Sequence, residues 1–407
     1  MAGPLSGIRV LDLSRVLAAP WAGQNLADLG AEVIKVERPK AGDDSRAFGP
    51  PWVKDPKGQD TRDSAYFTSA NRGKKSITVN LSKPEGQQLV RELAAKSDVL
   101  LENYKFGDLE RYGLGYEQLK AVNPRLVYCS VTGFGHTGPY REHPGYDFMI
   151  QGMGGMMSVT GEPDGAPGGG PQRAGVPIAD IITGMYASIA VCAALVHRAK
   201  SGEGQHLDLA LLDSQIALLA YQNTNYFATG KPPKRIGNLH PNIVPYQPFR
   251  TKDGSVILAC GNDNLYRKFC EVAGCTELAD DPRFASNGKR VENRGELTRL
   301  LQAIFAKKTT HEWVELLEAA GVANGPINDV AQVFQEPQVV ARGVRIELDH
   351  PVAGKLPLVA SPMRFSATPL EHRLAPPVLG QHTDEVLRSV LRKSEGEIAA
   401  LRAGGVI

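Results

Sequence analysis

A single carboxylate, Asp180, lies in a long apolar stretch and is the residue of this chain best suited to chemistry. Residues 174–200 are almost all apolar or small, so an unpaired ionised side chain there carries a large desolvation cost. A carboxylate needs no partner base to act as a nucleophile, because its usual pKa near ~3.9 keeps it ionised at neutral pH. Asp180 is therefore a candidate nucleophile toward an activated acyl group, and a helix cap is the alternative.

Glycine-containing segments accompany this carboxylate along the chain. Gly145-Tyr146-Asp147 precedes it, a glycine-rich run covers residues 152–170, and another glycine is Gly261. Attack by Asp180 on an acyl group would give an acid anhydride, which is lost to water unless the site closes. The glycine-rich run and the segment around Gly261 are candidate lids for that purpose, or plain loops.

Basic side chains recur after predicted strands in the N-terminal part of the chain. Ligands of open α/β sheets bind at the carboxyl ends of the strands, so a phosphate-rich ligand is one interpretation and a solvated surface is the other. Asn103 and Tyr104 follow a strand that ends at Glu102 and offer an amide and a ring at the same edge. The basic residues are Arg15, Lys35, Arg38, Arg72, Lys74, Lys75 and Arg111.

No other motif indicates a known catalytic chemistry. The sequence has no serine nucleophile elbow, phosphate-binding loop or spaced metal cluster, and His240 in its loop is more typical of a surface residue than of a base. Cys270 and Cys275 lack the histidine pair of a zinc site, so we expect no metal. The five cysteines are odd in number, which indicates a reducing compartment rather than a disulfide scaffold.

The bulk composition is that of an ordinary globular protein. The 407 residues are 42% hydrophobic and 22% charged with a net charge of +2, so no bulk charge draws the chain to nucleic acid or to anionic membranes. The longest apolar run, residues 176–196, contains Asp180 and Pro177, which favours a buried core helix over a membrane span. A strand pattern begins near Ile8 and leaves no room for a signal peptide, so we expect a cytoplasmic protein.

Short apolar strand patterns alternate with helical patterns in residues 1–135. This alternation predicts a Rossmann-like α/β fold, with a mostly parallel sheet and helices on its faces. Ser82-Lys83-Pro84-Glu85 predicts a capped helix start. The glycine fingerprint of dinucleotide-binding folds is missing after the first strand, which disfavours a nicotinamide cofactor. The predicted elements cover residues 8–13, 17–29, 33–36, 76–80, 85–96, 99–102 and 126–131.

The length of 407 residues exceeds what one core normally holds, so two domains are expected. After a helical segment over residues 212–227 the pattern changes at a linker-like stretch, and a hairpin over residues 249–259 follows. We predict a large domain formed by residues 1–222 and completed by 331–407. A smaller α+β domain, residues 223–330, is inserted in it.

Eight short segments of the sequence, in the same order along the chain, resemble the class III CoA-transferase family. This family also includes α-methylacyl-CoA racemase. The resemblance runs essentially from end to end, through Val10–Leu13, Gly30–Glu37, Asn71–Ser76, Glu102–Tyr104, Gly113–Tyr116, Thr132–Pro139, Gly145–Asp147 and Asp180–Gly184. Within the family the chain is most similar to the branch that uses succinyl-CoA and dicarboxylic acceptors such as glutarate or 3-hydroxy-3-methylglutarate. Four further segments indicate that branch: Gly42–Asp44, Ile243–Gln247, Asn324–Asn328 and Pro376–His382.

The resemblance implies a covalent role for Asp180. Asp180 would accept the donor's acyl group as an anhydride and then carry CoA as an aspartyl thioester, which the acceptor carboxylate attacks. Tyr146 and Asp147 belong to the implied catalytic site. CoA thioesters are the implied substrates, no cofactor is tightly bound, and the protein is an interlocked homodimer. The implied CoA contacts are Arg15, Val16, Ala18, Arg38, Ala70, Arg72, Lys74, Asn103, Tyr104 and Arg111.

At a few positions this sequence differs from particular members of the family, and these differences favour some activities of the family over others. Racemases of this fold have a histidine at the position of Tyr146, and a tyrosine with a usual pKa near ~10 is a poor base at neutral pH, so CoA transfer is favoured over racemisation. Leu17 replaces a glutamine of the oxalate-specific enzyme, and the lid here is Gly261-Asn262-Asp263-Asn264, which disfavours oxalate. Arg173, His240 and Gly261 are candidate contacts of the acid substrate. An acyl-CoA racemase and a non-catalytic acyl-CoA binding protein remain as alternatives.

Overall fold

The computed structural model describes residues 3–407, which form two compact units. One unit comprises the segment that ends at Met156, together with Ala174–Thr229 and Pro337–Ile407. The second unit comprises Met157–Arg173 and Gly230–Glu336. Most of the glycine-rich run, which we expected in the large domain, therefore groups with the second unit.

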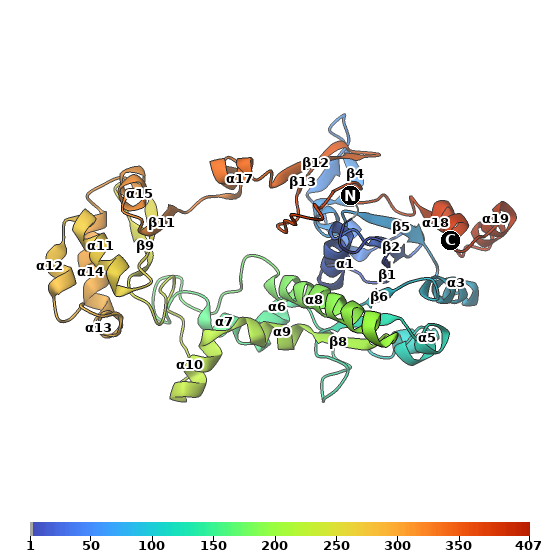
Figure 1. The fold of residues 1–407 in the computed structure, drawn as a ribbon, viewed down its shortest axis with the longest axis horizontal. Helices are drawn as coiled ribbons and strands as arrows, with labels where there is room; N and C mark the ends of the chain where they lie inside the picture. The colour runs from blue at the N-terminus through green and yellow to red at the C-terminus, as the bar shows by residue number, and fades with distance from the viewer. Residues whose placement is uncertain (1–2) are drawn as a thin grey trace. The chain divides into compact units, whose positions relative to one another are not determined.

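A six-stranded sheet organises the first unit (Figure 1). Its strand order is β5-β2-β1-β6-β7-β8, and every neighbouring pair is parallel. The predicted α/β class with a parallel sheet is therefore confirmed. The strands are β1 (Arg9–Asp12), β2 (Glu32–Glu37), β5 (Lys74–Thr78), β6 (Val99–Glu102), β7 (Val127–Thr132) and β8 (His206–Ala210).

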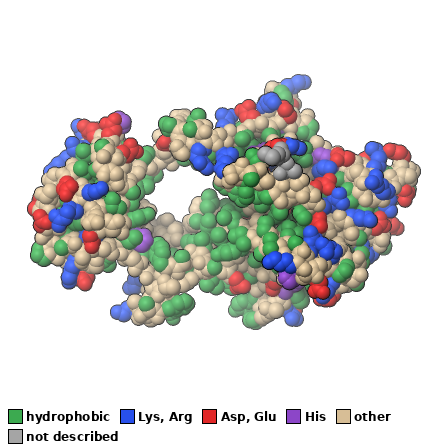
Figure 2. Space-filling model, viewed as in Figure 1, with side chains coloured by type: hydrophobic (Ala, Val, Ile, Leu, Met, Phe, Trp, Pro, Cys, Tyr) green, Lys and Arg blue, Asp and Glu red, His purple; other side chains and the backbone are tan. Residues whose placement is uncertain are grey.

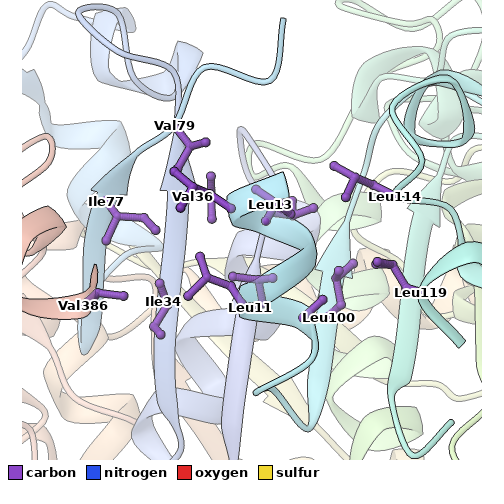
Figure 3. Packing of buried hydrophobic residues seen from close by; sticks show 14 of the residues in the cluster. Leu11, Leu13, Ile34, Val36, Ile77, Val79, Leu100, Leu114, Leu119 and Val386 are labelled. Carbon is purple, nitrogen blue, oxygen red and sulfur yellow. The ribbon is translucent and has the colours of Figure 1, made fainter. Parts of the chain in front are cut away.

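Alternate residues along each strand face opposite sides of the sheet, and each side has its own hydrophobic core. On one side, helices α1 and α8 pack over Val10 and Val33. On the other side, α3, α5, α18 and α19 cover Leu11, Ile34 and Leu100, which point to the same face in Figure 3. These helices are α1 (Ala18–Asp28), α3 (Pro84–Ala94), α5 (Tyr116–Val122), α8 (Ile178–Ser201), α18 (Thr383–Ser389) and α19 (Glu395–Ala403).

The C-terminal segment returns to the edge strand β5, so residues far apart in the sequence lie side by side (Figure 1). His382 N donates to Ser76 O at 2.9 Å, and Asn80 N donates to Val406 O at 2.7 Å. The other elements of this unit are 3₁₀ helix η1 (Asp44–Ala47), β3 (Trp52–Lys54), β4 (Asp60–Ser64), α2 (Ala65–Ser69), α4 (Asp108–Arg111), α6 (Asp147–Met153), α9 (Leu211–Leu218), α10 (Tyr221–Thr229), α17 (Pro337–Ala341), β12 (Arg345–His350) and β13 (Gly354–Val359).

The second unit contains a three-stranded antiparallel sheet of order β11-β10-β9. Its core is aromatic: the ring centroids of Phe249 and Phe305 are 4.6 Å apart, and Trp313 packs on Phe305. Its elements are β9 (Tyr246–Arg250), β10 (Ser255–Ala259), β11 (Ala323–Pro326), α11 (Asp263–Ala273), α12 (Thr276–Asp280), α13 (Asn287–Glu292), α14 (Arg294–Phe305), α15 (Thr310–Ala319) and α16 (Val330–Val333), while the short α7 (Met156–Val159) crosses the boundary between the units.

Helix α8 has two apolar faces with different surroundings. It is the one helix within residues 3–407 long and apolar enough to cross a membrane. Ala187 and Val191 on its inner face are fully buried in the core with α1, whereas Ile189 on its outer face is 62% exposed. The predicted buried core helix is therefore buried on one face only.

Two local predictions were wrong. Helix α3 begins at Pro84 and its N-cap residue is Lys83, which has no oxygen to accept from the first amides; Ser82 lies one residue earlier and donates its hydroxyl to the side chain of Asn80. The helix predicted over residues 212–227 is two helices, α9 and α10. They are separated at Ala220, whose φ of +44° lies in the left-handed region and ends α9.

Buried ion pairs lie on the α1 side of the sheet. Lys74 Nζ is 2.9 Å from Asp12 Oδ2, and both side chains are fully buried. Burial lowers the pKa of Lys74 to about 8, although the charge of Asp12 acts in the opposite direction. Burial also opposes ionisation of Asp12, but Lys74 and Lys35 outweigh it and lower the pKa of that carboxyl. The charged form of Lys74 is therefore stabilised by Asp12, and the charged form of Asp12 by Lys74 and Lys35.

We expect Lys74→Met to lower the free energy of unfolding by about 3–5 kcal/mol at pH 7, because it leaves Asp12 charged, buried and without Lys74. Urea unfolding followed by circular dichroism measures this change. Lys75→Met is the matched control: Lys75 is the next residue of β5, and its ion pairs with Glu32 and Glu385 are partly exposed. That variant is expected to lose less than about 1 kcal/mol. Equal losses in the two variants would contradict the argument.

Candidate active site

The start of helix α8 holds two acidic residues close together. Asp180 is the third residue of α8, and Asp147 is the first residue of α6. Asp147 Oδ1 accepts hydrogen bonds from Ala179 N at 2.8 Å and from Asp180 N at 3.4 Å. The side chain of Asp147 therefore caps α8 from another helix, and Asp180 itself is left with its carboxylate available.

Gln151 holds the Asp147 side chain in place. Its Nε2 donates to Asp147 Oδ2 at 2.7 Å, and its Oε1 accepts from Ala174 N at 2.8 Å. Gln151 is fully buried, as is most of Asp147. The buried amide thus connects α6 to the segment that leads into α8. It holds Asp147 and Asp180 in fixed positions relative to each other.

Two opposing effects set the charge of Asp180. Burial, together with the nearby charge of Asp147, raises its pKa from 3.8 to about 7. The N-terminus of α8 carries a partial positive charge, which favours the ionised carboxylate by roughly 0.3–1 kcal/mol. A carboxylate with a pKa near neutrality is more basic than an ordinary aspartate, and about half of it is ionised at pH 7.

A cavity of about 230 Å³ opens beside Asp180. Its walls come from the first unit only: the loop after β1, the loop after β6, and the segment between β7 and α6. Leu17 lines this cavity, and so do eight of the predicted site residues. These eight are Arg15, Val16, Ala18, Asn103, Tyr104, Tyr146, Asp147 and Asp180. The fold thus brings together eight predicted residues from four separate segments.

The loop after β1 is held in an unusual conformation. Val16 has a φ of +69°, which is rare for a β-branched residue and costs on the order of 1–3 kcal/mol. Its amide donates to Asp43 Oδ1 at 3.1 Å, and Asp43 Oδ2 lies 2.8 Å from the buried Lys35 Nζ. A reciprocal pair of hydrogen bonds also holds this loop. Arg15 N donates to Asn103 Oδ1 at 2.8 Å, and Asn103 Nδ2 donates to Arg15 O at 2.7 Å.

A second cavity of about 330 Å³ adjoins the first one through Arg15 and Tyr104. It lies at the carboxyl ends of β1, β2 and β5, where ligands of parallel sheets bind. Arg38 lines it, and Asp44 forms ion pairs with both Arg38 and Arg15. An anionic ligand would compete with Asp44 for these two guanidinium groups.

The remaining predicted residues lie elsewhere. Arg72 and Lys74 are buried and pair with Asp28 and Asp12, and Ala70 is fully buried. Arg111 is exposed and pairs with Asp108. Arg173, His240 and Gly261 belong to the second unit and do not line this cavity. Contact of these seven residues with a substrate therefore stays a prediction.

Sequence reasoning missed several residues of the site. Arg141, Phe106 and His143 line the cavity. Burial, with the charges of Asp180, Asp147 and Asp43, raises the pKa of Tyr66 to about 12, so this phenol stays protonated near the acidic pair. No spacing rule connects these positions to Asp180. Within residues 3–407, no group of three His, Cys, Asp or Glu side chains is placed to hold a metal ion.

Comparison with known proteins identifies the class of this protein, which is a CoA-transferase. Residues 5–383 match CoA-transferase family III, and the chain belongs to that family. A succinate–glutarate CoA-transferase of Agrobacterium fabrum is 50% identical over 94% of this chain and 95% of its own length. The succinyl-CoA:glutarate CoA-transferase of Homo sapiens is 43% identical over 99% of this chain and 90% of its own length. A crystal structure of a CAIB/BAIF family protein from Brucella suis, 49% identical, superposes with a TM-score of 0.83 over 96% of this chain and 100% of its own.

We expect kcat/KM to rise with pH and to level off above an apparent pKa near 7, because only ionised Asp180 is nucleophilic. Asp147→Asn keeps an oxygen to cap α8 and removes a negative charge beside Asp180, while its amide nitrogen takes the place of the oxygen that accepts from Gln151 Nε2. The apparent pKa in the kcat/KM profile of this variant should therefore be lower than in the wild type. Its activity should extend to more acidic pH. The pH profiles of the two enzymes, with circular dichroism at each pH as a folding control, measure the difference. Superimposable profiles would contradict the assigned coupling.

Proposed function

We propose that this protein transfers CoA from succinyl-CoA to a dicarboxylic acid, with glutarate as the first acceptor to test. The relatives from Agrobacterium fabrum and Homo sapiens carry this activity in their names, and the chain aligns with them over nearly its whole length. Other relatives act on D-citramalate and mesaconate, which are also dicarboxylic. The acceptor class is therefore better supported than the individual acid.

The proposed reaction passes through Asp180. Its carboxylate attacks the thioester carbonyl, a C–O bond forms, the C–S bond breaks, and CoA leaves as the thiolate. The thiolate attacks the Asp180 carbonyl carbon and releases the donor acid, which leaves an aspartyl-CoA thioester. The acceptor carboxylate attacks that carbonyl and expels the thiolate, and the thiolate then attacks the acceptor's acyl carbon to regenerate Asp180. No net proton is consumed.

The observation that carries this proposal is the position of Asp180. It is a partly buried carboxylate with a raised pKa at the start of a helix, and it opens into a cavity next to a second cavity that Arg15 and Arg38 line. Burial favours the anhydride because it limits attack by water. Tyr146 is 72% exposed and lines the cavity with Asp180, and by the family resemblance it stands where racemases of this fold have a histidine, which supports transfer over racemisation.

We expect Asp180→Asn to lower kcat by roughly a thousandfold or more, because an amide cannot form the anhydride. Wild-type protein incubated with succinyl-CoA and without acceptor should show a covalent adduct on the peptide that contains Asp180. Asp349→Asn, a change of an exposed carboxylate that pairs with Lys355, is the control and should retain normal turnover. A fully active Asp180→Asn variant, or an adduct on a different peptide, would refute the mechanism.

We also infer that the protein is a homodimer. Hydrophobic side chains gather over α6 and α8 in Figure 2. Met153 and Ile189 are more than half exposed, as is Phe227 of α10. Apolar patches of this kind are typical of protein interfaces. The interlocked arrangement follows from the family resemblance alone. A cytoplasmic location is a further proposal, which the five free thiols support.

Light scattering should give a mass of twice the chain's 43.9 kDa. Ile189→Arg places a charge in the middle of the apolar face of α8, and we expect it to shift the protein toward monomer at micromolar concentration. Val352→Arg changes a residue of similar type in the β12–β13 turn and should leave the mass unchanged. A monomeric wild type would refute the dimer.

A further inference from the structure

One wall of the cavity comes from a loop that is closed at its base. Residues 133–145 leave the end of β7 and return directly before Tyr146 and Asp147. Gly133 and Gly145 meet at the neck: a Cβ on Gly133 would lie 2.5 Å from the Cα of Gly145. No other residue type fits at that crossing without moving the backbone. We call this segment the 133–145 loop.

Internal packing and two anchors make the 133–145 loop rigid. The rings of Tyr140 and His143 stack at 4.9 Å, and Phe134 packs edge-on to Tyr140 at 5.5 Å. Gly135 N donates to Thr132 Oγ1 at 2.8 Å, and His136 N donates to Asp208 Oδ2 at 2.9 Å. Compact loops packed by their own side chains are frequently functional. The loop therefore holds its side chains at defined positions around the cavity.

The 133–145 loop presents Arg141 and His143 to the cavity, and of these two the guanidinium of Arg141 is the permanently charged group. Its guanidinium carbon lies 4.9 Å from the centre of the Phe106 ring, and His136 packs against the same ring at 5.5 Å. Stacking on a ring occupies the face of a guanidinium and leaves its N–H groups free at the edge. Among the described residues 3–407, Arg141 forms one ion pair, a 3.5 Å contact with its neighbour Glu142, and both side chains are about half or more exposed.

We propose that Arg141 binds the distal carboxylate of the dicarboxylic acyl group and so selects dicarboxylates over monocarboxylates. This inference rests on the proposed function and specifies its acyl subsite. Asp180 and Arg141 line the same cavity. A molecule with two carboxyl groups can thus present one to Asp180 and the other to Arg141. A guanidinium fork matches a carboxylate with two parallel hydrogen bonds, which an ammonium group cannot reproduce.

The other basic residues of the cavity fit this role less well. Arg15 forms an ion pair with Asp44 at 3.1 Å and stacks over Tyr104, so its charge is already partly compensated. It also lines the adjoining cavity, where the CoA moiety is expected. Lys105 is an exposed ammonium on the loop after β6, and His143 is an imidazole stacked on Tyr140; neither has the fork geometry of a guanidinium. Arg173 and His240, our sequence-based candidates, do not line this cavity.

The test compares substrates that differ only in the distal carboxylate. Succinyl-CoA and butyryl-CoA serve as donors, and glutarate and valerate as acceptors. In the wild type kcat/KM should favour both dicarboxylic substrates. We expect Arg141→Met to reduce each preference at least tenfold and Arg141→Lys to have an intermediate effect. Because each preference is a ratio measured on one protein sample, partial misfolding of a variant does not change it.

Lys105→Met is the matched control and should leave both ratios as in the wild type, whatever it does to the KM of the two donors. Unchanged ratios in Arg141→Met with a KM raised equally for both donors would assign Arg141 to the CoA moiety and overturn the proposal. Loss of preference in Lys105→Met alone would also overturn it. Failure of the proposed function is seen separately, as a wild type that transfers CoA from neither donor.

Discussion

The structure of the site depends on the capping of helix α8 by Asp147. Through the hydrogen bonds of its carboxylate to the first amides of the helix, Asp147 sets where α8 begins and therefore where Asp180 projects. The same charge helps to raise the pKa of Asp180 to about 7, after burial as the main cause. One interaction thus positions the nucleophile and adjusts its basicity. A neutral cap would keep the position but weaken the second effect.

Buried charge supports another part of the cavity wall, the loop after β1. Lys35 and Asp43 pair without any exposure, and Asp43 accepts the amide of Val16, whose backbone is strained. Strain of this kind persists only where surrounding structure over-determines it, and here the ion pair and the two-way contact between Arg15 and Asn103 do so. The first loop is therefore rigid before any substrate arrives, which lowers the entropy cost of binding.

Much of the fold was predictable from the sequence. The strand and helix periods of residues 1–135 predict the parallel sheet, because burial on both faces leaves near-continuous apolar runs in the strands. Local errors occurred where the hydrogen bond or the backbone conformation of a single residue, and not the apolar period, decided the outcome. Ser82 bonds to Asn80 instead of capping α3, and Ala220 takes a left-handed conformation that splits one predicted helix into two.

For the site, the sequence by itself identified Asp180, because a lone carboxylate in an apolar stretch is conspicuous, and the family motifs identified most residues of the first loops. Only the tertiary structure showed that Lys74 and Arg72 are committed to buried partners and that Arg141 and Tyr66 lie near Asp180. The physical reason is that periodicity and composition report whether a side chain prefers burial. They do not report which side chains from distant segments share one cavity or which charges neutralise each other.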